Sequence, residues 1–144
     1  MSQDHITGAI MNFSRQLRQE SDRILQENDI NTLQARILCF VSRNEKEPLC
    51  QRDFQEKFFA RGSTISGIVD TMEKEGLLSR IPEERDKRKN RVVLTEKGKT
   101  AANRCHAIFE DIDRQVTSTL DGKEAERFIS IMGKLQTSLE HMHE

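Results

Sequence analysis

The 144-residue chain contains no tryptophan and no tyrosine. Its aromatic residues are seven phenylalanines, most of which fall at positions that a helix would bury. Proteins that bind single-stranded nucleic acid without sequence preference stack bases on aromatic side chains. The sequence therefore argues against a binding protein of that class.

Cysteine is scarce as well, with only Cys39, Cys50 and Cys105. The number is odd and the residues lie far apart, so the sequence has neither a disulfide framework nor a CxxC pair of the kind that binds zinc. We infer a reducing compartment, most simply the bacterial cytoplasm. Cys39 and Cys105 lie on apolar helical stripes and are expected in the core. Cys50, near the start of a helix, is either an inert, partly buried residue or a thiol that senses oxidation.

The sequence lacks any stretch apolar enough to span a membrane, and its N-terminus does not have the pattern of a signal peptide. We therefore expect a cytoplasmic protein without a membrane partner. Phosphate loops, GxSxG and HExxH motifs are also missing, which argues against an enzyme and against a bound cofactor. The four histidines do not form a ligand pair of the usual spacing, except His141 and His143 near the end, so no metal site is predicted.

The net charge of −1 hides an uneven distribution. The segment 80–91 has six basic and three acidic residues, whereas residues 1–30 and 99–144 each have a net charge of −2. A positive centre between negative ends would orient the protein toward a polyanion such as DNA.

Apolar residues recur at helical spacing near both ends of the chain. They predict a first helix over residues 5–27 and a second helix that Thr32 caps. Toward the C-terminus, Thr95 is expected to cap one long helix, and Asp121 opens a capping box for another. The stripes of these long helices are too extensive to be buried on a small centre, which favours a homodimer.

The middle of the chain predicts two short helices, over residues 50–59 and 62–75, separated by a tight turn and stopped by Gly76. Strands are expected over residues 77–81 and 91–94, with Pro82 confining their pairing to the base of the ribbon. The predicted fold is mostly α (α+β), a winged helix-turn-helix with N- and C-terminal dimerisation helices. Its expected domains are residues 1–31 (dimerisation), 32–97 (DNA binding) and 98–144 (dimerisation).

Two features of this middle region suggest binding to double-stranded DNA. Small polar side chains on the second short helix suit the major groove, and a cationic ribbon tip suits the minor groove or phosphates. The alternatives are an ordinary polar helix face with a solvated hairpin tip, and a winged-helix module that binds a protein. The residues expected to contact DNA are Ser63, Thr64, Ser66 and Gly67 on the helix, and Arg85, Lys87, Arg88 and Lys89 on the ribbon tip.

The same residues resemble the MarR (multiple antibiotic resistance regulator) family of bacterial transcription factors. The likeness covers the segments 49–54 and 63–77, and its most specific parts are Asp86-x-Arg88 and Leu94-Thr95-x-x-Gly98. The resemblance implies a homodimer on a pseudo-palindromic operator and regulation, usually repression. It also implies relief by a small-molecule effector or by thiol oxidation. We expect the effector in a crevice between the dimerisation helices and the DNA-binding part.

The resemblance also implies roles for single residues. Ser63, Thr64, Ser66 and Gly67 match groove-facing positions, although Gly67 stands where many members have a longer polar side chain. Arg61 stands where members often have a small helix cap, so it loses a cap and gains a contact to phosphate or base. Arg88 matches the arginine that enters the minor groove, and Asp86 matches the acidic residue that orients the wing.

Overall fold

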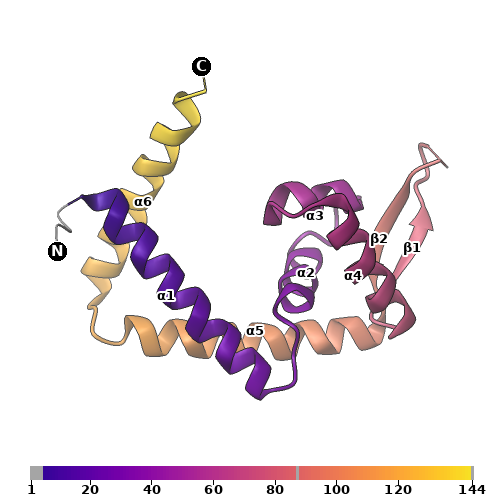
Figure 1. Cartoon of the computed structure of the whole chain (residues 1–144), viewed down its shortest axis with the longest axis horizontal. Coiled ribbons are helices and arrows are strands. Elements are labelled where there is room, and N and C mark those ends of the chain that lie inside the picture. The colour runs from indigo at the N-terminus through magenta and orange to yellow at the C-terminus, as the bar shows by residue number, and fades with distance from the viewer. Residues whose placement is uncertain (1–4, 87, 144) are drawn as a thin grey trace. The chain divides into compact units, whose positions relative to one another are not determined.

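The computed structural model describes residues 5–86 and 88–143, which form six helices and one two-stranded ribbon (Figure 1). The helix and strand boundaries predicted for residues 5–27 and 50–94 agree with the structure to within one residue. None of the helices in the described residues is long and apolar enough to cross a membrane. The elements are α1 (Ile6–Glu27), α2 (Thr32–Arg43), α3 (Gln51–Phe58), α4 (Gly62–Lys74), β1 (Leu78–Pro82), β2 (Asn90–Leu94), α5 (Glu96–Thr117) and α6 (Gly122–His141).

The chain divides into two compact units, residues 1–109 and 110–144. The first unit holds the winged helix-turn-helix. Its core is built from apolar residues that recur at helical spacing on α2, α3 and α4 and are closed by the ribbon. The largest completely buried side chains of this core are Phe54, Leu25, Ile37, Ile65 and Met72.

Two local predictions need correction. Asn31, and not Thr32, caps α2, because the Asn31 side chain accepts a hydrogen bond from the backbone N–H of Gln34 at 3.1 Å. Pro82 does not stop the ribbon early, since the antiparallel register runs from the pair Leu78 and Leu94 to the pair Pro82 and Asn90. Proline is tolerated there because it ends an edge strand, where a missing N–H breaks no inner ladder.

A dense junction joins the end of α4 to the start of α5. Gly76 has φ +77°, the left-handed conformation that a glycine after a helix adopts most easily. The Thr95 hydroxyl donates to the Gly76 carbonyl at 2.5 Å and accepts from the Gly98 N–H at 3.0 Å, so Thr95 caps α5 as predicted. A Cβ atom on Gly98 would lie 1.8 Å from the Leu77 carbonyl oxygen. The Leu94-Thr95-x-x-Gly98 motif is therefore the sequence that this close contact requires.

The second unit, residues 110–144, contains α6. The predicted capping box is present, since Asp121 accepts from the Glu124 N–H at 2.8 Å and Glu124 accepts from the Asp121 N–H at 3.1 Å. No side chain on α6 is buried within the single chain. Large apolar side chains are exposed on α6, namely Phe128, Ile129, Ile131 and Leu139.

Helix α1 belongs to the first unit and also leaves apolar side chains uncovered. Leu25 is its only buried residue, whereas Ile6, Met11 and Phe13 are exposed. The sequence predicted a second chain from the long apolar stripes of the terminal helices, and the single chain leaves apolar side chains on α1 and α6 exposed.

Candidate nucleic-acid interface

Helix α3 begins at a capped end and stops in a tight turn. The Asp53 carboxylate accepts a hydrogen bond from the Cys50 N–H at 2.8 Å, which satisfies a backbone donor that the first turn leaves free. The helix ends at Phe59 in the left-handed conformation, with φ +50° and ψ +40°. This turn allows α4 to start at Gly62, only four residues after α3 ends.

Helix α4 separates an apolar face from a small polar one. Its buried residues follow the spacing i, i+4 and i+7, which sets one stripe of the helix against the core. Among the polar residues predicted to contact DNA, Ser66 is half-buried and the others are exposed. The buried stripe consists of Ile65, Val69 and Met72, and the exposed residues are Ser63, Thr64 and Gly67.

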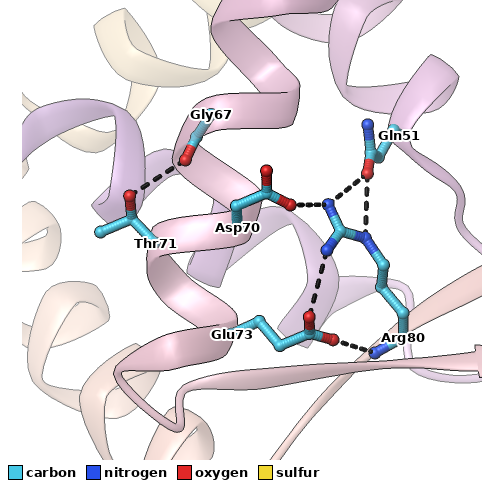
Figure 2. Close-up of polar contacts among 6 residues, drawn as sticks. All are labelled: Gln51, Gly67, Asp70, Thr71, Glu73 and Arg80. Carbon is cyan, nitrogen blue, oxygen red and sulfur yellow. Dashed lines mark hydrogen bonds and ion pairs between the residues drawn. The ribbon is translucent and has the colours of Figure 1, made fainter.

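Gly67 is not required by packing. A Cβ atom built on it would have no other atom within 4 Å. Glycine inside a helix costs about 1 kcal/mol relative to alanine. The Thr71 hydroxyl donates to the Gly67 carbonyl at 3.0 Å (Figure 2), so this carbonyl has a second hydrogen-bond donor besides the helix. At Gly67 the backbone of α4 is therefore exposed, with no side chain covering it.

Arg61 is the N-cap residue of α4 and is exposed. Its side chain makes no capping hydrogen bond, as the sequence predicted for an arginine at this position. The first N–H groups of α4 therefore receive no hydrogen bond from the Arg61 side chain.

The tip of the wing is organised by one carboxylate. Asp86 Oδ1 accepts hydrogen bonds from the Arg88 backbone N–H at 3.1 Å and from Arg88 Nε at 3.2 Å. The Arg88 side chain, followed by its backbone N–H, holds the pKa of the Asp86 carboxyl below its usual value. The Arg88 side chain nevertheless stays 91% exposed. Asp86 thus fixes the direction of an arginine that remains available to a ligand.

The remaining predicted cations of the wing are Arg85, Lys89 and Lys87. Arg85 and Lys89 are exposed in the structure. Lys87 lies outside the described residues. Below the tip, the Glu83 N–H donates to the Lys89 carbonyl at 2.8 Å, which continues the ladder of β1 and β2 toward the tip.

Arg80 on β1 joins three elements of this surface, as Figure 2 shows. Its Nη2 lies 2.7 Å from Asp70 Oδ1, and its Nη1 lies 3.2 Å from Glu73 Oε1, both on α4. Its Nε and Nη2 donate to Gln51 Oε1, the first residue of α3, at 3.0 and 2.6 Å. The Arg80 backbone N–H also donates to Glu73 Oε2 at 3.1 Å. Only 19% of the Arg80 side chain is exposed.

This arrangement has two consequences. Arg80 is one of the basic residues of segment 80–91. Its positive charge is paired with the carboxylates of Asp70 and Glu73, so it does not add to the unpaired charge of the wing. Because a guanidinium only donates, the Gln51 oxygen must face Arg80, so the Gln51 amide nitrogen is left for other partners. The residue pattern did not predict the pairing of Gln51 with Arg80. The one available signal in the sequence was the pair Asp70 and Glu73, three residues apart on one helix face.

The cysteines differ in their surroundings. Cys39 and Cys105 are buried in the core, as predicted, and Cys50 is half-buried at the start of α3. Burial raises the pKa of Cys39 to about 11, with a smaller contribution from nearby Cys105, and burial also raises the pKa of Cys105. The two core thiols are therefore protonated at neutral pH.

Both the sequence and the fold of this chain are similar to those of known proteins. A sequence profile described as the MarR family matches residues 28–89. The chain is 29% identical over 100 residues to the HTH-type transcriptional regulator BilQ of Clostridium symbiosum, and the match covers 69% of each chain.

Two solved structures have the same fold. The transcriptional regulator PA3341 is 23% identical, with a TM-score of 0.84 and coverage of 95% of this chain and 99% of the other. MepR from S. aureus, in its complex with DNA, is 22% identical, with a TM-score of 0.80 and coverage of 96% and 99%. These likenesses place the chain among winged helix-turn-helix proteins.

Proposed function

We propose that this chain is a transcription regulator of the MarR family, because a profile of that family matches residues 28–89 and a relative 29% identical is a transcriptional regulator. In this proposal it is a homodimeric repressor that binds a pseudo-palindromic operator in double-stranded DNA. Proteins of this family bind DNA and are not enzymes. The observation that carries the proposal is the Arg80 network, which holds an exposed polar helix face beside an exposed cationic wing. A relative of the same fold, MepR, has been solved with DNA, which supports this use of the fold.

Each part of the surface has a proposed role. Helix α4 enters the major groove, where Ser63 and Thr64 approach base edges. Gly67 lets the helix backbone come close to the bases, and Ser66 contributes from the edge of the same face. On the wing, Arg88 reaches the minor groove with Asp86 as its orienting partner. The flanking cations contact phosphates, namely Arg61, Arg85, Lys87 and Lys89.

Dimerisation is proposed through the terminal helices, in residues 1–31 and 98–144. The exposed apolar residues on α1 and α6 support this role, because uncovered apolar patches mark protein interfaces. A twofold axis would place the two α4 helices about 34 Å apart, the repeat of one DNA turn. Occupied operators would then exclude the polymerase.

The first test is selection of bound sequences from a random pool of duplex DNA, with the purified full chain. We expect an inverted repeat with half-sites about 10 base pairs apart, and sedimentation should give the mass of a dimer. Recovery of no preferred duplex, together with a stoichiometric protein partner in pull-down, would favour the alternative of a winged-helix interaction module. A recovered single half-site bound by a monomer would contradict the dimer.

The second test is the salt dependence of binding to the recovered repeat. Neutralised phosphates release counterions, so the logarithm of the affinity should fall linearly with the logarithm of salt concentration. Arg88→Ala should lower the steepness by about 0.9 per protomer, and Thr64→Ala should relax sequence preference. Lys123→Ala removes an exposed cation at the start of α6 and is the matched control. An effect of equal size in the control would contradict the wing assignment.

Regulation by a small-molecule effector is part of the proposal through the family alone. Thermal-shift screening of small anionic and aromatic compounds, followed by DNA binding in the presence of each hit, tests it. If no compound acts and oxidation of Cys50 leaves DNA binding unchanged, the protein would be a regulator controlled by its abundance.

A further inference from the structure

Phe59 combines two properties that are separately unfavourable. Its backbone has φ +50° and ψ +40°, the left-handed region in which a residue with a Cβ atom is strained. Its side chain is 96% exposed, so the ring touches almost nothing within the chain. The sequence predicted burial for most of the phenylalanines and made no prediction for Phe59.

The turn between α3 and α4 accounts for the left-handed backbone conformation of residue 59. It does not account for a phenylalanine side chain at that position. A helix that ends in a left-handed residue usually has glycine or asparagine there. An exposed position also favours a polar residue over phenylalanine. Asparagine or glycine at this position would therefore stabilise the fold more than phenylalanine does. Unfavourable conformations of this kind persist mainly at functional sites.

The neighbours of Phe59 hold it in place. Phe58 contacts Phe40 edge-on, with ring centroids 5.8 Å apart, and Ala60 packs against the core. The Ala60 N–H donates to the Gln55 carbonyl at 3.2 Å. Anchored residues on both sides therefore keep Phe59 exposed, three residues before α4 begins at Gly62 and two before the exposed Arg61.

We propose that Phe59 contacts DNA and packs its ring against a thymine methyl group at the edge of the major groove that α4 occupies. The thymine methyl is the one apolar group that base edges present in that groove, and phenylalanine is among the side chains that contact it. The ring makes this contact from the turn, beside the polar residues of α4. This inference rests on the proposed function, since it requires that α4 bind duplex DNA.

The test uses the full chain and the inverted repeat recovered by selection. Thymines of each half-site are replaced one at a time by deoxyuridine, which removes only the methyl group. For one thymine, wild-type affinity should fall about fourfold per half-site, the effect of one buried methyl group. Phe59→Asn should weaken binding to the thymine duplex by a similar factor and should be insensitive to that replacement. Phe59→Leu keeps an apolar side chain and should remain sensitive.

Stability measurements separate this contact from a structural role. Phe59→Asn relieves strain, so its melting temperature should equal or exceed that of the wild type while DNA binding falls. Asp29→Asn is the matched control, because Asp29 has φ +58° in the loop between α1 and α2 and should not affect DNA binding.

Three results would overturn the inference: an unchanged affinity of Phe59→Asn, a variant that stays as sensitive to deoxyuridine as the wild type, or a large fall in its melting temperature. Failure of the wild type to bind any duplex would instead refute the proposed function.

Discussion

Replacing Arg80 with alanine should weaken the fold and DNA binding together without removing a DNA contact. The substitution removes two ion pairs whose carboxylates are 53% and 43% exposed and a forked hydrogen bond to Gln51. Part-exposed ion pairs contribute about 0.5 kcal/mol each and a hydrogen bond to a charged group about 1.5 kcal/mol. The free energy of unfolding should therefore fall by about 2.5 kcal/mol, which is a melting temperature lower by roughly 8 °C for a chain of this length.

The DNA assay distinguishes a positioning residue from a contact residue. If Arg80 sets the angle between α4 and the wing, Arg80→Ala should reduce affinity for the recovered repeat about tenfold, roughly 1.4 kcal/mol, and leave the salt dependence unchanged. Arg88→Ala is the opposite case, with an unchanged melting temperature and a shallower salt dependence. Arg80→Lys should restore only part of the affinity, since an ammonium group cannot make the same forked contacts.

An Arg80→Ala variant with wild-type stability and a salt dependence shallower by about 0.9 per protomer would refute this role of Arg80. Arg80 would then be an ordinary phosphate-binding cation.

Three further predictions concern the glycines and the cysteines. Gly98→Ala places a Cβ atom 1.8 Å from the Leu77 carbonyl oxygen, so the free energy of unfolding measured in urea should fall by about 3 kcal/mol. Gly67→Ala, whose Cβ atom would have nothing within 4 Å, should be neutral or slightly stabilising. Equal effects of the two substitutions would contradict a close contact at Gly98. A thiol reagent at pH 8 should label Cys50 in the folded protein and spare Cys39 and Cys105 until the chain unfolds; native labelling of all three would refute the burial argument. Because burial raises the pKa of Cys39 from 9.0 to about 11, its contribution to stability should be complete below pH 9 and lost as the pH rises toward 11, measured by thermal unfolding with pH.

Local chemistry explains what the sequence predicted well. Gly76, Thr95 and Asp121 act on backbone groups within a few residues of themselves or at the next element, and their roles follow from residue type and spacing. The helices could be located from the periodicity of the apolar residues, because burial of one helix face fixes the spacing of these residues along the sequence. The error at Thr32 came from Asn31, an equally good cap one residue earlier.

The Arg80 network could not be predicted in the same way. Its partner Gln51 lies 29 residues away, and only the folded arrangement of three elements brings them together. The exposure of Phe59 depends likewise on a turn conformation that its residue type does not favour. The DNA-contacting roles of Ser63, Thr64 and the wing cations stay predictions, because they concern a partner that binds from outside.

The junction at Thr95 and Gly98 makes α5 a lever. Thr95 and Lys97 bond to the carbonyls of Gly76 and Glu75, so the start of α5 is tied to the end of the α4 segment. The part of α5 that belongs to the first unit, residues 96–109, is about 21 Å long. A tilt of roughly 8° about one end of this segment displaces the other end by about 3 Å, comparable to the spacing of stacked base pairs. In the proposed function, such a tilt would shift α4 along the DNA by about one base pair.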